Sequence, residues 1–233
     1  MSDDTPLPYV GVGTVLDAVL NGGEGLLRWA WKQGAQGVNL EQARERGYAR
    51  GRRVHQVFER MVAGEMPVVR TFPLELRDPL DALVAWWQET TPEFEAVEAD
   101  VHSERLRVRG RLDFARRCRG EAAEGRPCFR GGSYFDGEWT DVYAFGGDCQ
   151  GAGVRIGDFK IGWIKGPKVH LQVGGAYPLL WVESGRAEPV CGAELVGLNV
   201  NRDAKYVVAP ARGTPATFER AVAFYREVAL LQG

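Results

Sequence analysis

Residues 153–162 read GVRIGDFKIG, a pattern that predicts a short β-strand ending at a glycine. Side chains alternate between the two faces of a strand, so we expect Asp158 and Lys160 on the same face. A carboxylate beside an ammonium at a strand end can bind a metal ion and organise a phosphate or a water molecule. Only five of the 29 basic residues are lysines, and three of them lie between 160 and 168. Position 160 therefore favours an ammonium over a guanidinium.

The apolar periodicity around this strand alternates between helix and strand. Apolar residues spaced three and four positions apart predict helices. The longest of these has Asn39 as its N-cap and ends at Gly64. Alternation predicts strands, and residues 118–150, rich in Gly and turn residues, read as an irregular insertion with a hairpin around 139–145. The other predicted helices are two short ones within 12–34, one from about Pro79, one at 167–183 and one at 215–231. The predicted strands are 93–101, 105–116, the 153–162 strand, 194–201 and 205–209.

This order predicts an α/β (α+β) fold with a central mixed β-sheet flanked by helices. At 233 residues we expect one domain, with a helical part at about 1–92 and a core at about 93–233 that carries the insertion. The net charge of −2 argues against unspecific coating of nucleic acid but leaves room for a local DNA site. The sequence contains no apolar run of about 18 residues, so it predicts no membrane-spanning helix. The acidic N-terminus lacks the pattern of a signal peptide, so we expect a cytoplasmic protein.

Two aspartates are predicted to meet at neighbouring strand ends. Asp113 closes a strand face that otherwise carries arginines, and the Asp158 strand should lie beside it. Two carboxylates in one place repel each other unless a cation lies between them, and oxygen ligands suit Mg²⁺ or Mn²⁺. His55 borders the apolar face of its helix, and its nitrogen would shift the preference toward Mn²⁺.

These residues resemble the ordered motifs of RecB-type nucleases in the PD-(D/E)XK superfamily, which also includes CRISPR-associated and phage recombination exonucleases. The resemblance spans roughly residues 45–180. It rests on Gly51-Arg52-Arg53-Val54-His55, Gly110-Arg111-Leu112-Asp113, Gly157-Asp158-Phe159-Lys160, Gln172 and Tyr177. It implies a restriction-endonuclease-like core and a divalent-metal-dependent DNA nuclease. An exonuclease in DNA repair, recombination or phage DNA processing is favoured, with DNA as partner and a recombination or repair protein as a further candidate partner.

The resemblance also assigns roles to single residues. It implies that His55, Asp113, Asp158 and the backbone carbonyl of Phe159 bind Mg²⁺ or Mn²⁺. Lys160 would position or activate the attacking water and stabilise the charged phosphate, and Gln172 would line the site and touch DNA.

Two features depart from the family pattern. The family spaces its glutamine and tyrosine four apart, whereas Gln172 and Tyr177 are five apart, which on an α-helix separates them by roughly 140° and makes a core role for Tyr177 an alternative. Some relatives hold an iron–sulfur cluster with one early and three late cysteines. This chain has no cysteine before Cys118 and only Cys191 late, so no cluster is predicted.

Several polar residues have both a functional and an ordinary interpretation. Glu59 and Glu98 are candidates for orienting the metal ligands, or are solvated charges. Asp158 and Lys160 themselves could form a plain surface ion pair. Two whole-protein alternatives also stay open: an inactive nuclease-fold module that binds DNA or protein, and a zinc-stabilised interaction domain. The candidate DNA-contacting rim consists of Arg107, Lys165, Lys168, His170 and Tyr177, and the candidate zinc ligands are Cys118, Cys128 and Cys149.

Overall fold

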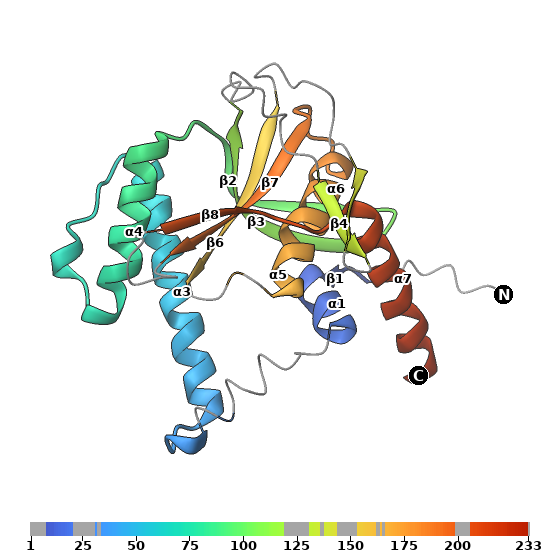
Figure 1. Cartoon of the computed structure of the whole chain (residues 1–233), viewed down its shortest axis with the longest axis horizontal. Helices are drawn as coiled ribbons and strands as arrows, with labels where there is room; N and C mark the ends of the chain where they lie inside the picture. The colour runs from blue at the N-terminus through green and yellow to red at the C-terminus, as the bar shows by residue number, and fades with distance from the viewer. Residues whose placement is uncertain are drawn as a thin grey trace.

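The protein is a mixed α/β structure in which helices cover both faces of a central mixed sheet, as the sequence predicted (Figure 1). The computed structural model describes residues 8–20, 31, 34–118, 131–135, 138–143, 153–161, 164, 166–198 and 206–232. Lys165, Cys128 and Cys149 lie outside these residues, as does most of the predicted insertion.

The sheet combines parallel and antiparallel pairs. Its order is β1-β3-β6-β7-β8, with β2 paired to the remaining edge of β3. The pairs β1–β3 and β6–β7 are parallel and the others antiparallel. The strands are β1 (Val10–Gly11), β2 (Phe94–Ser103), β3 (Val108–Arg117), β6 (Val154–Ile161), β7 (Val190–Leu198) and β8 (Tyr206–Pro210).

The sheet opens between β3 and β6. β6 pairs with β3 only through residues 114–117, and β1 pairs with β3 through Val108 and Arg109. Because β2 occupies the opposite edge of β3 along its length, residues 110–113 have no strand partner on the β6 side among the described residues. Among the described strands, residues 158–161 of β6 likewise pair only with β7. The two strands that carry the predicted aspartates therefore separate just where those aspartates lie.

Packing of Phe114 against Gly157 marks the point where the strands diverge. These two residues are register partners, and a Cβ on Gly157 would lie 1.9 Å from Cζ of Phe114. The ring of Phe114 joins an aromatic cluster with Phe58, Trp86 and Phe159, whose ring centroids lie 4.7–6.1 Å apart. Only glycine permits this arrangement, which fixes the backbone of the strand immediately before Asp158.

Two hydrophobic cores lie on the two faces of the sheet. One contains α3 (Leu40–Val62) and α4 (Leu74–Thr90), and the aromatic cluster belongs to it. The other contains α1 (Val12–Val19), α7 (Pro215–Gln232) and the long helix 167–183. Figure 1 shows these two groups of helices on either side of the strands.

Helix α3 follows its sequence prediction closely. The side chain of Asn39 accepts hydrogen bonds from the backbone N–H groups of Glu41 and Gln42, which satisfies two donors of the first turn. The helix ends before Gly64, which adopts a φ of +92° that glycine accommodates readily.

Other boundaries differ from the prediction. Helix α4 begins at Leu74, directly after Pro73, rather than near Pro79. Pro79 removes the donor that the carbonyl of Glu75 would use, but Glu75 is exposed, so water can hydrogen-bond that carbonyl. Strand β7 begins at Val190, four residues before the predicted start, because its first residues pair with the start of β6. The predicted hairpin forms a separate two-stranded sheet from β4 (Gly131–Phe135) and β5 (Glu138–Tyr143).

The described cysteines, Cys118 and Cys191, are buried and pack together in one small cluster. Sγ of Cys191 lies 3.2 Å from the carbonyl oxygen of Val154. Among the described helices, none combines the length and the apolar character that a bilayer span requires.

Candidate metal centre

The opening between β3 and β6 holds a set of polar side chains. Asp113 is 7% exposed at the unpaired edge of β3, and its Oδ2 accepts a hydrogen bond of 2.7 Å from the backbone N–H of Phe159. This bond replaces the β-ladder bond that β6 loses when it leaves β3. In a strand the N–H and C=O of one residue point to the same edge, so the carbonyl of Phe159 also faces the opening.

His55, Glu98 and Asp113 form a compact ligand set. Nδ1 of His55 lies 2.7 Å from Oε1 of Glu98 and 3.6 Å from Oδ1 of Asp113. One nitrogen and two carboxylate oxygens from these residues all lie within 4.8 Å of one another. One nitrogen with two carboxylate oxygens is a donor set that suits Mn²⁺ and accepts Mg²⁺.

Glu98 has a more central position than the sequence indicated. It lies on β2 opposite Asp113, because the flanking register pairs are Val97 with Phe114 and Ala99 with Leu112. Its φ of +46° is left-handed, which is strained for a glutamate. The hairpin turn after β2 could have revealed this register, since a turn centred between residues 105 and 106 places Glu98 across from Asp113.

Asp158 and Lys160 lie on one face of β6, as alternation predicted. Nζ of Lys160 is 2.5 Å from Oδ2 of Asp158, in an ion pair rather than an aligned hydrogen bond. Asp158 is 2% exposed, and its carboxylate turns toward the lysine instead of joining the His55–Glu98–Asp113 set. The structure thus places Asp158 beside the ligand set while a different carboxylate, that of Glu98, is closest to the imidazole.

The electrostatics of the centre reflect excess buried negative charge. Burial raises the pKa of Asp113 to about 7, and the Asp158 charge adds to this, against the opposing effects of His55, Lys160 and the Phe159 N–H. Burial lowers the pKa of His55, but the hydrogen bond to Glu98 and the charges of Asp113, Glu98 and Asp158 outweigh it and raise the pKa to about 9.

Lys160 carries its positive charge firmly. Desolvation lowers the pKa of its ammonium, yet the charges of Asp158 and Asp113 outweigh this and raise the pKa above its ordinary value. At neutral pH the side chain is therefore a hydrogen-bond donor and a positive charge, not a base.

Gln172 and Tyr177 meet through a π-helical turn. The predicted angle of 140° assumed an α-helix and is wrong, because residues Gln172–Ala176 form a π-helix between α5 (Pro167–Leu171) and α6 (Tyr177–Glu183). The N–H of Tyr177 donates to the carbonyl of Gln172, five residues back. Each π turn holds one more residue, so Nε2 of Gln172 lies 2.6 Å from the tyrosine hydroxyl.

Tyr177 is both buried and part of the polar centre. It is 4% exposed, and burial followed by the charges of Asp158 and Asp113 raises the pKa of its hydroxyl. A Cβ on Gly110 would lie 3.0 Å from the tyrosine ring, so Gly110 of β3 makes room for it. The opening in the sheet thus receives His55 from one helical layer and Gln172 with Tyr177 from the other.

Glu59 and Arg107 lie outside the centre. Arg111 joins Oε2 of Glu98 at 3.0 Å to Oε1 of Glu59 at 3.8 Å, so Glu59 reaches the ligand set only through this arginine. Arg107 packs its guanidinium over the ring of Tyr9 and pairs with Glu104 in the turn between β2 and β3. That turn is six residues from Asp113, or about 20 Å along an extended strand.

The remaining rim candidates lie around α5. Nζ of Lys168 lies 2.5 Å from Oδ1 of Asp17 at the end of α1. Nδ1 of His170 accepts a hydrogen bond from the backbone N–H of Arg212, and burial, with the Arg212 charge, lowers the pKa of the imidazole. His170 is thereby held in its neutral form against the loop before α7.

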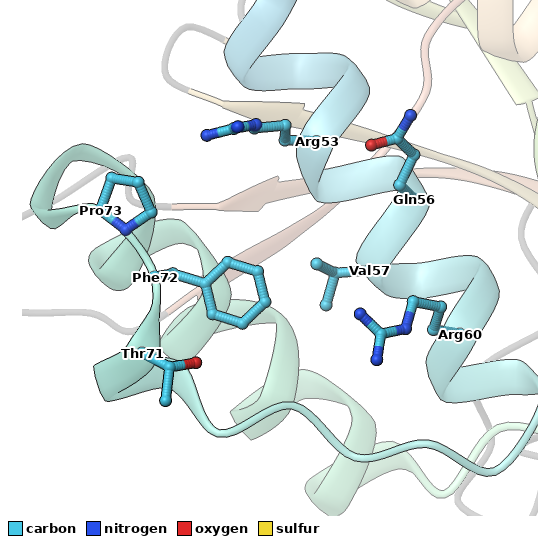
Figure 2. Close-up of a pocket in the computed structure, with 7 residues that line it drawn as sticks. All are labelled: Arg53, Gln56, Val57, Arg60, Thr71, Phe72 and Pro73. Carbon is cyan, nitrogen blue, oxygen red and sulfur yellow. The ribbon is translucent and has the colours of Figure 1, made fainter.

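A shallow pocket lies on the other flank of α3, away from His55. Figure 2 shows it between α3 and the segment that precedes α4. Its side chains from α3 are Arg53, Gln56, Val57 and Arg60, and those from the segment are Thr71, Phe72 and Pro73. Arg60 is paired with Glu65 at 2.7 Å, which neutralises part of the charge there.

No family model matches the sequence, and no curated protein matches it. The interpretation of the centre therefore depends on its own chemistry.

Proposed function

We propose that the protein is a divalent-metal-dependent DNA nuclease that hydrolyses phosphodiester bonds, with exonuclease action favoured. The observation that supports this most strongly is the convergence of His55, Glu98, Asp113, Asp158 and Lys160 at the opening between β3 and β6. Carboxylates and an imidazole suit a metal ion, and a lysine at the same place suits a phosphate. The resemblance to RecB-type nucleases of the PD-(D/E)XK superfamily supports the proposal through His55, Asp113, Asp158 and Lys160, although Glu98 rather than Asp158 completes the compact ligand set.

The ligand set fits a resident Mg²⁺ or Mn²⁺ ion. The pKa of Asp113 is raised because its buried carboxylate lacks enough positive charge nearby, and a cation within the set would supply it. His55, Glu98 and Asp113 would hold the ion, with Asp158 and the carbonyl of Phe159 as further ligands. When bound, such an ion lowers the pKa of a coordinated water and neutralises charge on the phosphate.

The protein's own side chains account for the rest of the reaction. Water attacks phosphorus in line with the leaving oxygen, a new P–O bond forms and the bond to that oxygen breaks. The attacking water gives up one proton to solvent, and the departing oxygen takes up one proton from solvent. Lys160, held as an ammonium by Asp158, donates to a phosphate oxygen and stabilises the charge that develops there. Gln172 and the Tyr177 hydroxyl form a hydrogen-bonded wall that positions the substrate.

Cleavage of end-labelled linear DNA and closed circular DNA, with Mn²⁺, Mg²⁺ or EDTA, tests this proposal. We expect metal-dependent loss of the linear substrate and protection of the circle. Asp158→Asn and Lys160→Met should each lower the rate by at least 100-fold. The first weakens the hold on the metal ion and on the Lys160 ammonium, and the second removes the positive charge beside the reacting phosphate. The matched control is Asp81→Asn on the exposed face of α4, which should retain the rate.

Three results would contradict parts of the proposal. Full activity of Asp158→Asn or Lys160→Met would reject the assigned centre. Rapid cutting of the circle would reject exonuclease action and favour an endonuclease. Binding of DNA with no metal-dependent cleavage would favour an inactive nuclease-fold module instead.

A further inference from the structure

The first half of α3 is an exposed, basic helix segment. Residues 40–53 are exposed or half-exposed throughout and carry five arginines against two glutamates. Figure 1 shows this part of α3 extending beyond the sheet, whereas the second half packs on it. His55, the first residue of α3 that reaches the metal centre, lies where the exposed segment meets the body of the protein.

The arginines of this segment lie on two different faces. At about 100° per residue, Arg44, Tyr48 and Arg52 fall within about 80° of one another on the side of His55. Arg46, Arg50 and Arg53 fall on the opposite side, toward the pocket of Figure 2. Glu41 falls on the His55 side, one turn beyond Arg44 and at the end of the segment remote from the metal centre.

The face on the His55 side has the composition of a single-strand binding surface. Tyr48 is 61% exposed, so its ring is accessible to a base that stacks on it. It lies between two exposed arginines, and its hydroxyl is hydrogen-bonded to Arg44. At a rise of 1.5 Å per residue, Tyr48 stands about 10 Å and Arg44 about 16 Å from His55 along the helix.

Gly51 keeps the space next to His55 open. It lies one helical turn before His55 on the same side, and a Cβ added to it would meet nothing within 4 Å. Glycine weakens a helix relative to alanine, and packing within the described protein does not require it here. A glycine that packing does not need fits a place where a ligand backbone approaches the helix closely.

We propose that the Arg44–Tyr48–Arg52 face of α3 binds a single DNA strand and leads it to the metal centre. A base stacks on the ring of Tyr48, and the guanidinium groups of Arg44 and Arg52 contact phosphates on either side. Stacking on an exposed ring requires an unpaired base, so the occupant is a single strand and not a duplex. The inference deepens the proposed nuclease function, since the strand would enter the centre past Gly51.

Binding measured without chemistry tests this face separately from catalysis. Fluorescence anisotropy in EDTA compares a labelled 20-nucleotide dT strand, a 20-base-pair duplex and a 20-nucleotide U strand at several salt concentrations. Tyr48→Ala should raise the Kd for the dT strand by about 5- to 150-fold, whereas Tyr48→Trp should leave it within a few-fold. Arg44→Ala/Arg52→Ala should reduce the slope of log Kd against log salt by about 1.4, for two lost phosphate contacts.

The matched control removes the same charge from the other face of the same helix. Arg46→Ala/Arg53→Ala should leave the salt slope near that of the wild type, and thermal unfolding should show that all variants stay folded. Equal losses in the two double variants, an unchanged Kd for Tyr48→Ala, or tighter binding of the duplex would overturn the proposal. Equal Tyr48-dependent binding of the U strand would reject selectivity for DNA.

The two proposals can fail independently. If the wild type cleaves DNA but Tyr48→Ala binds as tightly as before, the nuclease stands and the strand-binding face is rejected. If Tyr48-dependent binding is found but no metal supports cleavage, the face stands and the nuclease is rejected.

Discussion

Replacing Asp113 by asparagine should make the metal-free protein more stable, although the residue belongs to the proposed centre. Burial and the charge of Asp158 raise the pKa of Asp113 from its ordinary value of 3.8 to about 7. Between these two pH values the folded protein binds a proton that the unfolded chain has lost, so the free energy of unfolding falls as pH rises from about 4 to about 7. Asparagine keeps the acceptor for the Phe159 N–H and removes the charge.

The magnitude follows from the two pKa values. At 1.36 kcal/mol for each tenfold change, the raised pKa of Asp113 destabilises the folded state by at most about 4 kcal/mol at pH 8 and by less than half of this at pH 5. His55 loses an attractive partner in the variant, which lowers its raised pKa and removes part of the gain. We therefore expect Asp113→Asn to stabilise the metal-free protein by about 2 kcal/mol at pH 8 and by less at pH 5.

Urea denaturation in EDTA at pH 5 and pH 8 measures these differences, with Asp81→Asn as an exposed control that should change little at either pH. In Mn²⁺ at 100 times its Kd, the wild type should gain about 2.7 kcal/mol, and Asp113→Asn should gain much less. A variant that is less stable than the wild type at pH 8 in EDTA, or a difference that is the same at both pH values, would refute the reasoning.

Three further substitutions have defined outcomes. Glu194→Gln should lower the free energy of unfolding in urea by about 3 kcal/mol, because it weakens the buried ion pair with Arg116 at 2.6 Å across the sheet. Gly157→Ala should cost about 1–3 kcal/mol in the same assay, since the new methyl group would overlap Phe114; an unchanged midpoint would contradict the close packing at the strand divergence. Gly51→Ala should raise the free energy of unfolding by about 1 kcal/mol, because alanine favours the exposed helix, and should lower the rate of DNA cleavage. A more stable variant whose cleavage rate is unchanged or higher would exclude a ligand above that glycine.

The features predicted from sequence are those that local chemistry determines. Asn39 caps α3 because its own side chain reaches the first turn, and the strand with Asp158 and Lys160 follows from alternation within ten residues. The pairing of that strand with the strand of Asp113 was also predicted, since both carry polar ends. The proposed activity and metal remain predictions from these residues and from the family resemblance.

What the sequence did not reveal depends on contacts between distant segments. The left-handed backbone of Glu98 is strained and persists because neighbouring strands hold it, so no local pattern announces it. Helix α4 begins five residues before Pro79 because an interior proline is tolerated where water reaches the freed carbonyl. The π turn after Leu171 likewise depends on tertiary packing: Gly174 and Gly175 lie against the backbone of Gly213 and Thr214, where a Cβ would come within 2.8 Å.

The π turn also bears on how this helix tolerates changes in length. A chain with one residue fewer between Gln172 and Tyr177 could bring the same two side chains together from a regular α-helix, since they would then be four positions apart. The extra residue is absorbed locally, and the helical segments before and after it keep their own faces toward the sheet. A single-residue deletion within this turn would therefore shorten the spacing of the two residues in the sequence and leave the glutamine–tyrosine pair in place.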